Sequence, residues 1–124
     1  MDIPKFTKYN LIQSFRYAFS GFLFAMFREK NIQIQFATGA IFIGLTIIIG
    51  NYELLLAHVV LMTVVMGFEL VNTAIEALAD IVQPDFDERI GRVKDIMAAA
   101  VLLVSLVWFG LLLLILYQLV KTMI

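Results

Sequence analysis

The sequence predicts an all-α membrane protein, in which an N-terminal amphipathic surface helix precedes three transmembrane helices. Of its 124 residues, 62% are hydrophobic, whereas soluble domains are roughly half apolar. A chain this short cannot hide so much apolar surface in a water-soluble core. It also contains three apolar stretches near the roughly 20 residues that a membrane helix needs, and a backbone in lipid satisfies its hydrogen bonds as helix. We expect residues 1–124 to form a single membrane-embedded domain.

The surface helix is expected over about residues 5–30, where apolar side chains fall on one helical stripe and polar ones such as Gln13, Arg16 and Ser20 lie away from it. Such a helix lies in the membrane interface with its apolar face buried. The stripe consists of Ile12, Phe15, Phe19, Phe22, Leu23 and Met26.

The three spans are expected at about residues 33–50, 54–79 and 96–120. The first connection, around Asn51, is so short that the first two spans must form an antiparallel hairpin. The second connection, about residues 80–95, is longer and charged, and its Gln83-Pro84-Asp85 is typical of a turn because Pro fixes φ and Asp favours turns.

Basic residues predict the orientation, because Lys and Arg concentrate on the cytoplasmic side of membrane proteins. Only Lys121 follows the third span. The other basic residues precede the first span or lie in the second connection, which makes the N-terminus cytoplasmic and the C-terminus external. They are Lys5, Lys8, Arg16, Arg28, Lys30, Arg89, Arg92 and Lys94.

Composition excludes several functions. The net charge of −1 argues against nucleic-acid binding, and the absence of cysteine excludes disulfides, thiolate metal sites and cysteine nucleophiles. No cleavable signal peptide is expected, because no short basic segment with a small-residue cleavage site opens the chain. The glycine-rich nucleotide motifs are also missing, so any use of ATP must do without a P-loop.

The second span carries a row of polar and acidic residues at Glu69, Asn72, Glu76 and Asp80. At 100° per residue the four project within an arc of about 80°, with Glu69 roughly 16 Å deeper than Asp80. Carboxylates at that depth cost several kcal/mol unless they meet a partner, a metal ion or water. A purely structural interpretation needs buried cations, and the nearest ones lie at the cytoplasmic edge. The row is therefore the predicted working site.

Two carboxylates one or two turns apart can share a divalent cation with phosphate oxygens. A deeper carboxylate can act as a base on a group that arrives from the lipid. Glu29, at a similar depth to Glu76, could complete a carboxylate cage. Lys94, at the start of the third span beside Asp95, could meet phosphate charge.

Other polar residues are less informative. His58 and Trp108 are expected to be packed, and Ala98–Ala100 predict a surface for close helix approach. Tyr17 and Asn31 lie near the cytoplasmic interface. Either could anchor the interface or contact a ligand.

The run Glu69-Leu70-Val71-Asn72-Thr73-Ala74-Ile75-Glu76-Ala77-Leu78-Ala79-Asp80 resembles the signature of the small prokaryotic diacylglycerol kinase family, E-x-x-N-[ST]-A-I-E-x-x-x-D. Lys94-Asp95 follows at the family's spacing, and an Ala-rich third span comes next. Glu29 stands where the family has an acidic residue before its first span. The similarity extends from about Phe15 to Val120.

The resemblance implies a homotrimer that transfers the ATP γ-phosphate to a lipid hydroxyl with Mg²⁺. It implies Glu69 as the catalytic base and Glu29 and Glu76 as metal ligands. The implied nucleotide contacts are Tyr17, Glu29, Glu76, Asp85, Phe86, Asp87, Lys94 and Asp95, and the supporting residues are Asn72, Asp80 and Asn31. The loop matches by position only, since Asp85-Phe86-Asp87 stands where Gram-negative members have Glu-Tyr-His.

The family has two branches, which phosphorylate diacylglycerol or undecaprenol. Here Glu29-Lys30-Asn31 and Lys94-Asp95-Ile96 look more like the undecaprenol kinases of Gram-positive bacteria. The expected location is the bacterial cytoplasmic (inner) membrane, with the active site at the cytoplasmic face. The rival hypothesis is an oligomeric ion or proton conductor with the carboxylates as a relay. A relay needs polar stations in the outer half, where the second span offers only Thr63 and His58, and the third only Ser105.

Overall fold

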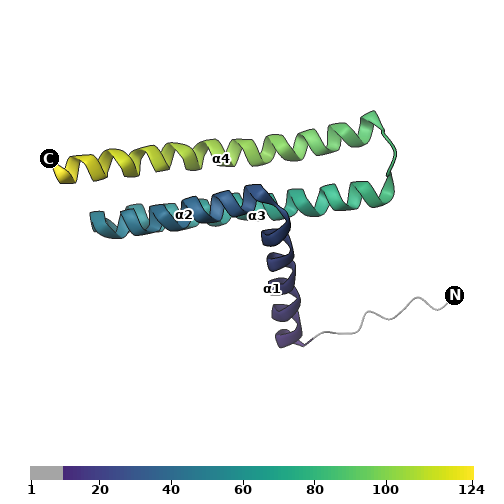
Figure 1. The fold of residues 1–124 in the computed structure, drawn as a ribbon, viewed down its shortest axis with the longest axis horizontal. Helices are drawn as coiled ribbons and strands as arrows, with labels where there is room; N and C mark the ends of the chain where they lie inside the picture. Colours follow the sequence, from purple (N-terminus) through teal and green to yellow (C-terminus); the bar gives the residue numbers. More distant parts are fainter. Residues whose placement is uncertain (1–9) are drawn as a thin grey trace.

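The computed structural model describes residues 10–124, so the first part of the expected surface helix, residues 5–9, lies outside the described residues. Four helices and no strand occupy this part of the chain: α1 (Leu11–Arg28), α2 (Lys30–Ile49), α3 (Tyr52–Val82) and α4 (Glu88–Met123). α2, α3 and α4 run along one axis, and α1 leaves them at a steep angle (Figure 1). Those three are long and apolar enough to cross a membrane. The predicted all-α membrane fold is confirmed.

The junction between α1 and α2 is a single extended residue, Glu29 (φ −102°, ψ 114°). Its N–H donates to the Ala25 carbonyl at 2.9 Å, which ends α1. The side-chain Nε2 of Gln33 then donates to the Met26 carbonyl at 3.0 Å and links the two helices. α1 therefore ends two residues before the expected end of the surface helix, and α2 begins three residues before the expected start of the first span.

The turn from α2 to α3 consists of two residues with complementary roles. Gly50 adopts the left-handed conformation (φ 72°) and closes α2, a backbone position that favours glycine. Asn51 then caps α3 by accepting a hydrogen bond from the Leu54 N–H at 3.0 Å. The predicted antiparallel hairpin of the first two spans is confirmed by this tight connection.

The connection between α3 and α4 is much shorter than expected. α3 continues to Val82 and α4 begins at Glu88, eight residues before the predicted start of the third span. Asp87 caps α4 by accepting from the Arg89 N–H at 2.8 Å, and Glu88 pairs with Arg92 at 2.7 Å one turn on. The charged residues that suggested a loop thus form a helical extension beyond the apolar span.

A polar contact joins all three long helices in the half of the bundle that lies toward Tyr52. His58 is fully buried on α3; its Nε2 lies 3.1 Å from the Gly39 carbonyl on α2, and its Nδ1 accepts from the Trp108 indole N–H on α4 at 3.2 Å. A carbonyl only accepts and an indole N–H only donates, so the His58 hydrogen sits on Nε2. Around it the apolar core gathers Leu54, Val65, Leu112 and Ile115. The expectation that His58 and Trp108 are packed is confirmed.

Candidate active site

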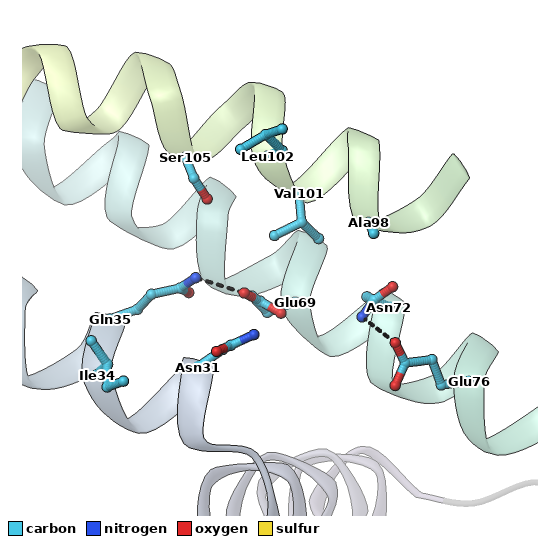
Figure 2. Close-up of a pocket in the computed structure, with 10 residues that line it drawn as sticks. All are labelled: Asn31, Ile34, Gln35, Glu69, Asn72, Glu76, Ala98, Val101, Leu102 and Ser105. Carbon is cyan, nitrogen blue, oxygen red and sulfur yellow. Dashed lines mark hydrogen bonds between the residues drawn. The ribbon is translucent and has the colours of Figure 1, made fainter. Parts of the chain in front are cut away.

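A cavity of about 400 Å³ opens between α2, α3 and α4, and three members of the polar row of α3, Glu69, Asn72 and Glu76, line it (Figure 2). Glu69 is only 4% exposed, Glu76 is half-buried and Asp80 is exposed, so burial falls along the row toward the end of α3. The cavity is lined by Asn31, Ile34, Gln35, Glu69, Asn72, Glu76, Ala98, Val101, Leu102 and Ser105.

Helical rise places the deep end of this row inside the bilayer. Seventeen residues separate Glu69 from the start of α3 at Tyr52, which is about 26 Å of helix. A hydrocarbon core is roughly 30 Å thick. With Tyr52 taken at one membrane face, this rise puts Glu69 just inside the opposite boundary and Glu76, about 10 Å farther along the helix, at that boundary.

Two amide side chains hold the two carboxylates of the cavity. The Gln35 Nε2 on α2 donates to the Glu69 Oε1 at 2.7 Å, and the Asn72 Nδ2 donates to the Glu76 Oε1 one turn along α3 at 3.0 Å (Figure 2). Because a carboxylate only accepts hydrogen bonds, each amide must turn its nitrogen toward its acidic partner. Both bonds leave one carboxylate oxygen uncommitted.

The oxygen ends of the same two amides have no partner within residues 10–124. There Gln35 Oε1 and Asn72 Oδ1 are buried atoms without a hydrogen bond, and burying a polar atom unpaired costs about 1–3 kcal/mol. The Asn72 amide oxygen and the Glu76 carboxylate are both hard oxygen ligands, the kind that Mg²⁺ prefers. The residues present therefore fit a divalent cation that takes its remaining ligands from phosphate and water.

Glu29 does not line this cavity. Its Oε1 lies 3.8 Å from the Arg28 Nε, although its charge and that of Glu76 act on Glu69. Within residues 10–124, no group of three or more acidic or histidine side chains could hold a metal ion. Within one chain, Glu29 thus lies outside the cavity that Glu69 and Glu76 line.

Asp80 and Lys94 form an ion pair between α3 and α4. The Lys94 Nζ donates to the Asp80 Oδ1 at 2.6 Å and joins α4 to α3. Glu76 lies within electrostatic reach of Lys94, whereas Asp95 is exposed on the next position of α4. The structure therefore gives Asp80, predicted as a supporting residue, a specific ion-pair partner.

The remaining predicted nucleotide contacts lie outside the cavity. Phe86 is 95% exposed in the loop after Asp85, and Asp87 caps α4. The Arg89 side chain donates to the Asp87 carboxylate at 2.8 Å, and this bond, with that from the Arg89 N–H, lowers the pKa of Asp87. Tyr17 lies on α1, whereas Asn31, the other residue near the interface, does line the cavity.

Sequence analysis did not predict the roles of Gln35 and Ser105. Gln35 lies one helical turn after Asn31, so a polar pair on one face of an otherwise apolar helix was the signal that could have revealed it. Ser105 was considered only as a station in a proton relay. In the structure both residues line the cavity that holds Glu69.

Comparison with known proteins gives consistent results. The prokaryotic diacylglycerol kinase family profile matches residues 16–116. A diacylglycerol kinase of Synechocystis sp. is 35% identical over 99 residues, covering 78% of this chain and 57% of that protein, so the chain spans little more than half of this relative. A diacylglycerol kinase of Haemophilus influenzae is 30% identical over 108 residues, covering 83% of this chain and 92% of that protein. No solved structure matches the chain significantly.

Proposed function

Because the chain belongs to the prokaryotic diacylglycerol kinase family, we propose that it is a lipid kinase that transfers the γ-phosphate of ATP to the hydroxyl of a membrane lipid. The observation that carries this proposal is the position of Glu69. It is a buried carboxylate on a helix long and apolar enough to cross a membrane, and it lines a cavity together with Glu76. In such a cavity a lipid hydroxyl and a water-soluble phosphate donor would meet.

The proposed reaction assigns one task to each end of the polar row. Glu69 accepts the proton of the lipid hydroxyl, and the hydroxyl oxygen then forms a bond to the γ-phosphorus. The bond from that phosphorus to the β,γ-bridging oxygen breaks, and ADP leaves. Phosphoryl transfer of this kind depends mainly on the positioning of the reactants and on stabilisation of charge. The carboxylate and amide side chains of the cavity would serve both purposes.

We propose that Mg²⁺ is required and that Glu76 holds it together with the unpaired Asn72 oxygen, with Glu29 as the second predicted carboxylate ligand. A bound Mg²⁺ would neutralise charge on the transferred phosphate. Lys94, already placed near Glu76 by Asp80, would add positive charge for the phosphates. The loop from Asp85 to Asp87, together with Tyr17 and Asp95, remains the proposed contact region for the rest of the nucleotide.

We also propose a homotrimer in the bacterial cytoplasmic membrane, with the N-terminus and the catalytic cavity at the cytoplasmic face. The positive-inside bias of the sequence supports this orientation. The oligomer is proposed from the family resemblance. Because Glu29 lies outside the cavity of its own chain, a neighbouring subunit could complete the metal site.

The lipid is proposed to be undecaprenol, with diacylglycerol as the second candidate. Both present one hydroxyl on a long apolar body, which suits a cavity with Glu69 at its polar end. The names of the relatives refer to diacylglycerol, whereas Glu29-Lys30-Asn31 and the alanines after Lys94-Asp95 favour undecaprenol. A direct comparison of the two lipids separates these possibilities.

The rival hypothesis of an ion or proton conductor finds no support in this bundle. Both ring nitrogens of His58 are engaged, by Gly39 and Trp108. The Thr63 hydroxyl donates to a carbonyl of its own helix at 2.8 Å. A relay from Glu69 toward the far membrane face would need polar groups free to exchange protons.

The test is phosphorylation by purified protein in lipid nanodiscs with radiolabelled ATP, run in parallel on undecaprenol and diacylglycerol. We expect labelled lipid phosphate, loss of the product in excess EDTA, and recovery on adding Mg²⁺. If neither lipid is labelled while the protein is folded, the proposed activity is wrong. ATP-independent proton flux through liposomes would instead support the conductor.

A further inference from the structure

Gln35 occupies the border between two connected cavities. The first is the polar cavity around Glu69. The second, of about 310 Å³, runs between α2 and α4 and is mostly apolar. The two share Ile34, Gln35 and Ser105. A lipid whose hydroxyl reaches Glu69 and whose hydrocarbon follows the apolar cavity must pass these three side chains.

We propose that Gln35 is a positioning residue for Glu69: its amide fixes the carboxylate so that one oxygen stays directed at the lipid hydroxyl. This inference rests on the proposed lipid kinase function. Gln35 belongs to α2 and Glu69 to α3, and the donor–acceptor distance between them is 2.7 Å, at the short end for N–H···O bonds. The bond engages Oε1 of Glu69 and thereby leaves Oε2 for the substrate.

A comparison within the bundle separates this role from a purely structural one. His58 also bridges helices, but both of its ring nitrogens are satisfied by protein groups. Gln35 is satisfied only on the side that faces Glu69, and its buried Oε1 has no protein partner. A glutamine selected only for helix packing would pair both ends of its amide, because each unpaired end costs stability.

The test uses Gln35→Met, which keeps the length of the side chain and removes both hydrogen-bonding ends. We expect kcat for lipid phosphorylation to fall about 10–100-fold, since small misplacements of reacting groups have effects of this size. The KM for MgATP should stay within about twofold, because the nucleotide lies toward Glu76 and Lys94. Gln118→Met makes the same chemical change at the far end of α4 and should leave both constants unchanged.

The double variant Gln35→Met/Glu69→Gln distinguishes positioning from structure. If Gln35 acts through Glu69, adding Gln35→Met to Glu69→Gln causes no further fall in kcat, because residues that work as a unit are not additive. An equal further fall in that background, or wild-type kcat in Gln35→Met, would overturn the inference. If Gln35→Met does not fold, Gln35→Asn replaces it: its shorter amide cannot reach Glu69 without a shift, so kcat should again fall and unchanged kcat would count against the proposal.

The same measurements distinguish a failure of the proposed function from a failure of the proposed role of Gln35. A folded wild-type protein that labels neither lipid would overturn the proposed function and this inference with it. An active wild type whose Gln35→Met variant is equally active would overturn the role of Gln35 alone.

Discussion

Replacing His58 with Phe should destabilise the bundle without changing its chemistry. The substitution roughly keeps the ring volume at a fully buried position and removes the contacts to the Gly39 carbonyl and the Trp108 N–H. Interhelical hydrogen bonds in membranes contribute about 0.6 kcal/mol on average and up to about 1.7. The Trp108 N–H is also left unpaired in an apolar interior, at about 1–3 kcal/mol. We therefore expect a loss of about 2 kcal/mol in the free energy of unfolding.

Equilibrium unfolding in mixed micelles with increasing sodium dodecyl sulfate measures this loss, and 2 kcal/mol corresponds to a shift of about 30-fold in the unfolding constant. Trp108→Phe and the double variant complete a cycle. We expect the effects of the two changes to overlap by about 0.6–1.7 kcal/mol, the range for a membrane hydrogen bond. Effects that add to within about 0.3 kcal/mol would refute the reasoning, because they would mean that the two side chains do not interact. The kcat of folded His58→Phe should match the wild type.

Three further predictions concern the end of the bundle at which α3 ends and α4 begins. Glu76→Gln should raise the apparent Mg²⁺ requirement and the KM for MgATP about tenfold or more, as measured by metal titration of initial rates; unchanged metal dependence would remove Glu76 from the metal site. Asp80→Asn frees the Lys94 ammonium from its ion pair. The KM for MgATP should change, while the free energy of unfolding should stay near that of the wild type. A large loss of stability would show that the pair is structural. The Arg89 bonds lower the pKa of Asp87, so the cap stabilises α4 above the ordinary carboxyl pKa and loses that effect as pH falls through the lowered value. Hydrogen exchange at the start of α4, corrected for intrinsic rates, should therefore be slower at pH 7 than at pH 3, and Asp87→Ala should remove the difference.

Much of the fold followed from the sequence because lipid imposes strong rules on it. Spans of sufficient length must be helical, and the polar row of α3 lies on one face because four residues share the helical period. The burial gradient from Glu69 to Asp80 agrees with the expected depth of each residue. These features depend on local periodicity, which a sequence displays directly.

Other features depend on partners that periodicity does not identify. The start of α4 was misplaced because the charged residues after Asp87 suggested a loop, whereas a cap and the Glu88–Arg92 pair continue the helix. The bond from Gln35 to Glu69 spans two helices, and its existence depends on how α2 rotates against α3. The ion pair of Asp80 with Lys94 likewise requires the short loop between α3 and α4, and the predicted loop, over residues 80–95, was too long.

The measurement that tests the central claim most directly is turnover by Glu69→Gln alongside nucleotide binding by the same variant. The substitution keeps the shape of the side chain and removes its ability to accept a proton, and general base catalysis typically contributes about 10²–10⁴-fold. We predict that lipid phosphorylation falls by at least about 100-fold while the affinity for MgATP, measured by calorimetry on the folded protein, stays within a few-fold of the wild type. Near-normal phosphorylation of the lipid by Glu69→Gln would contradict the account.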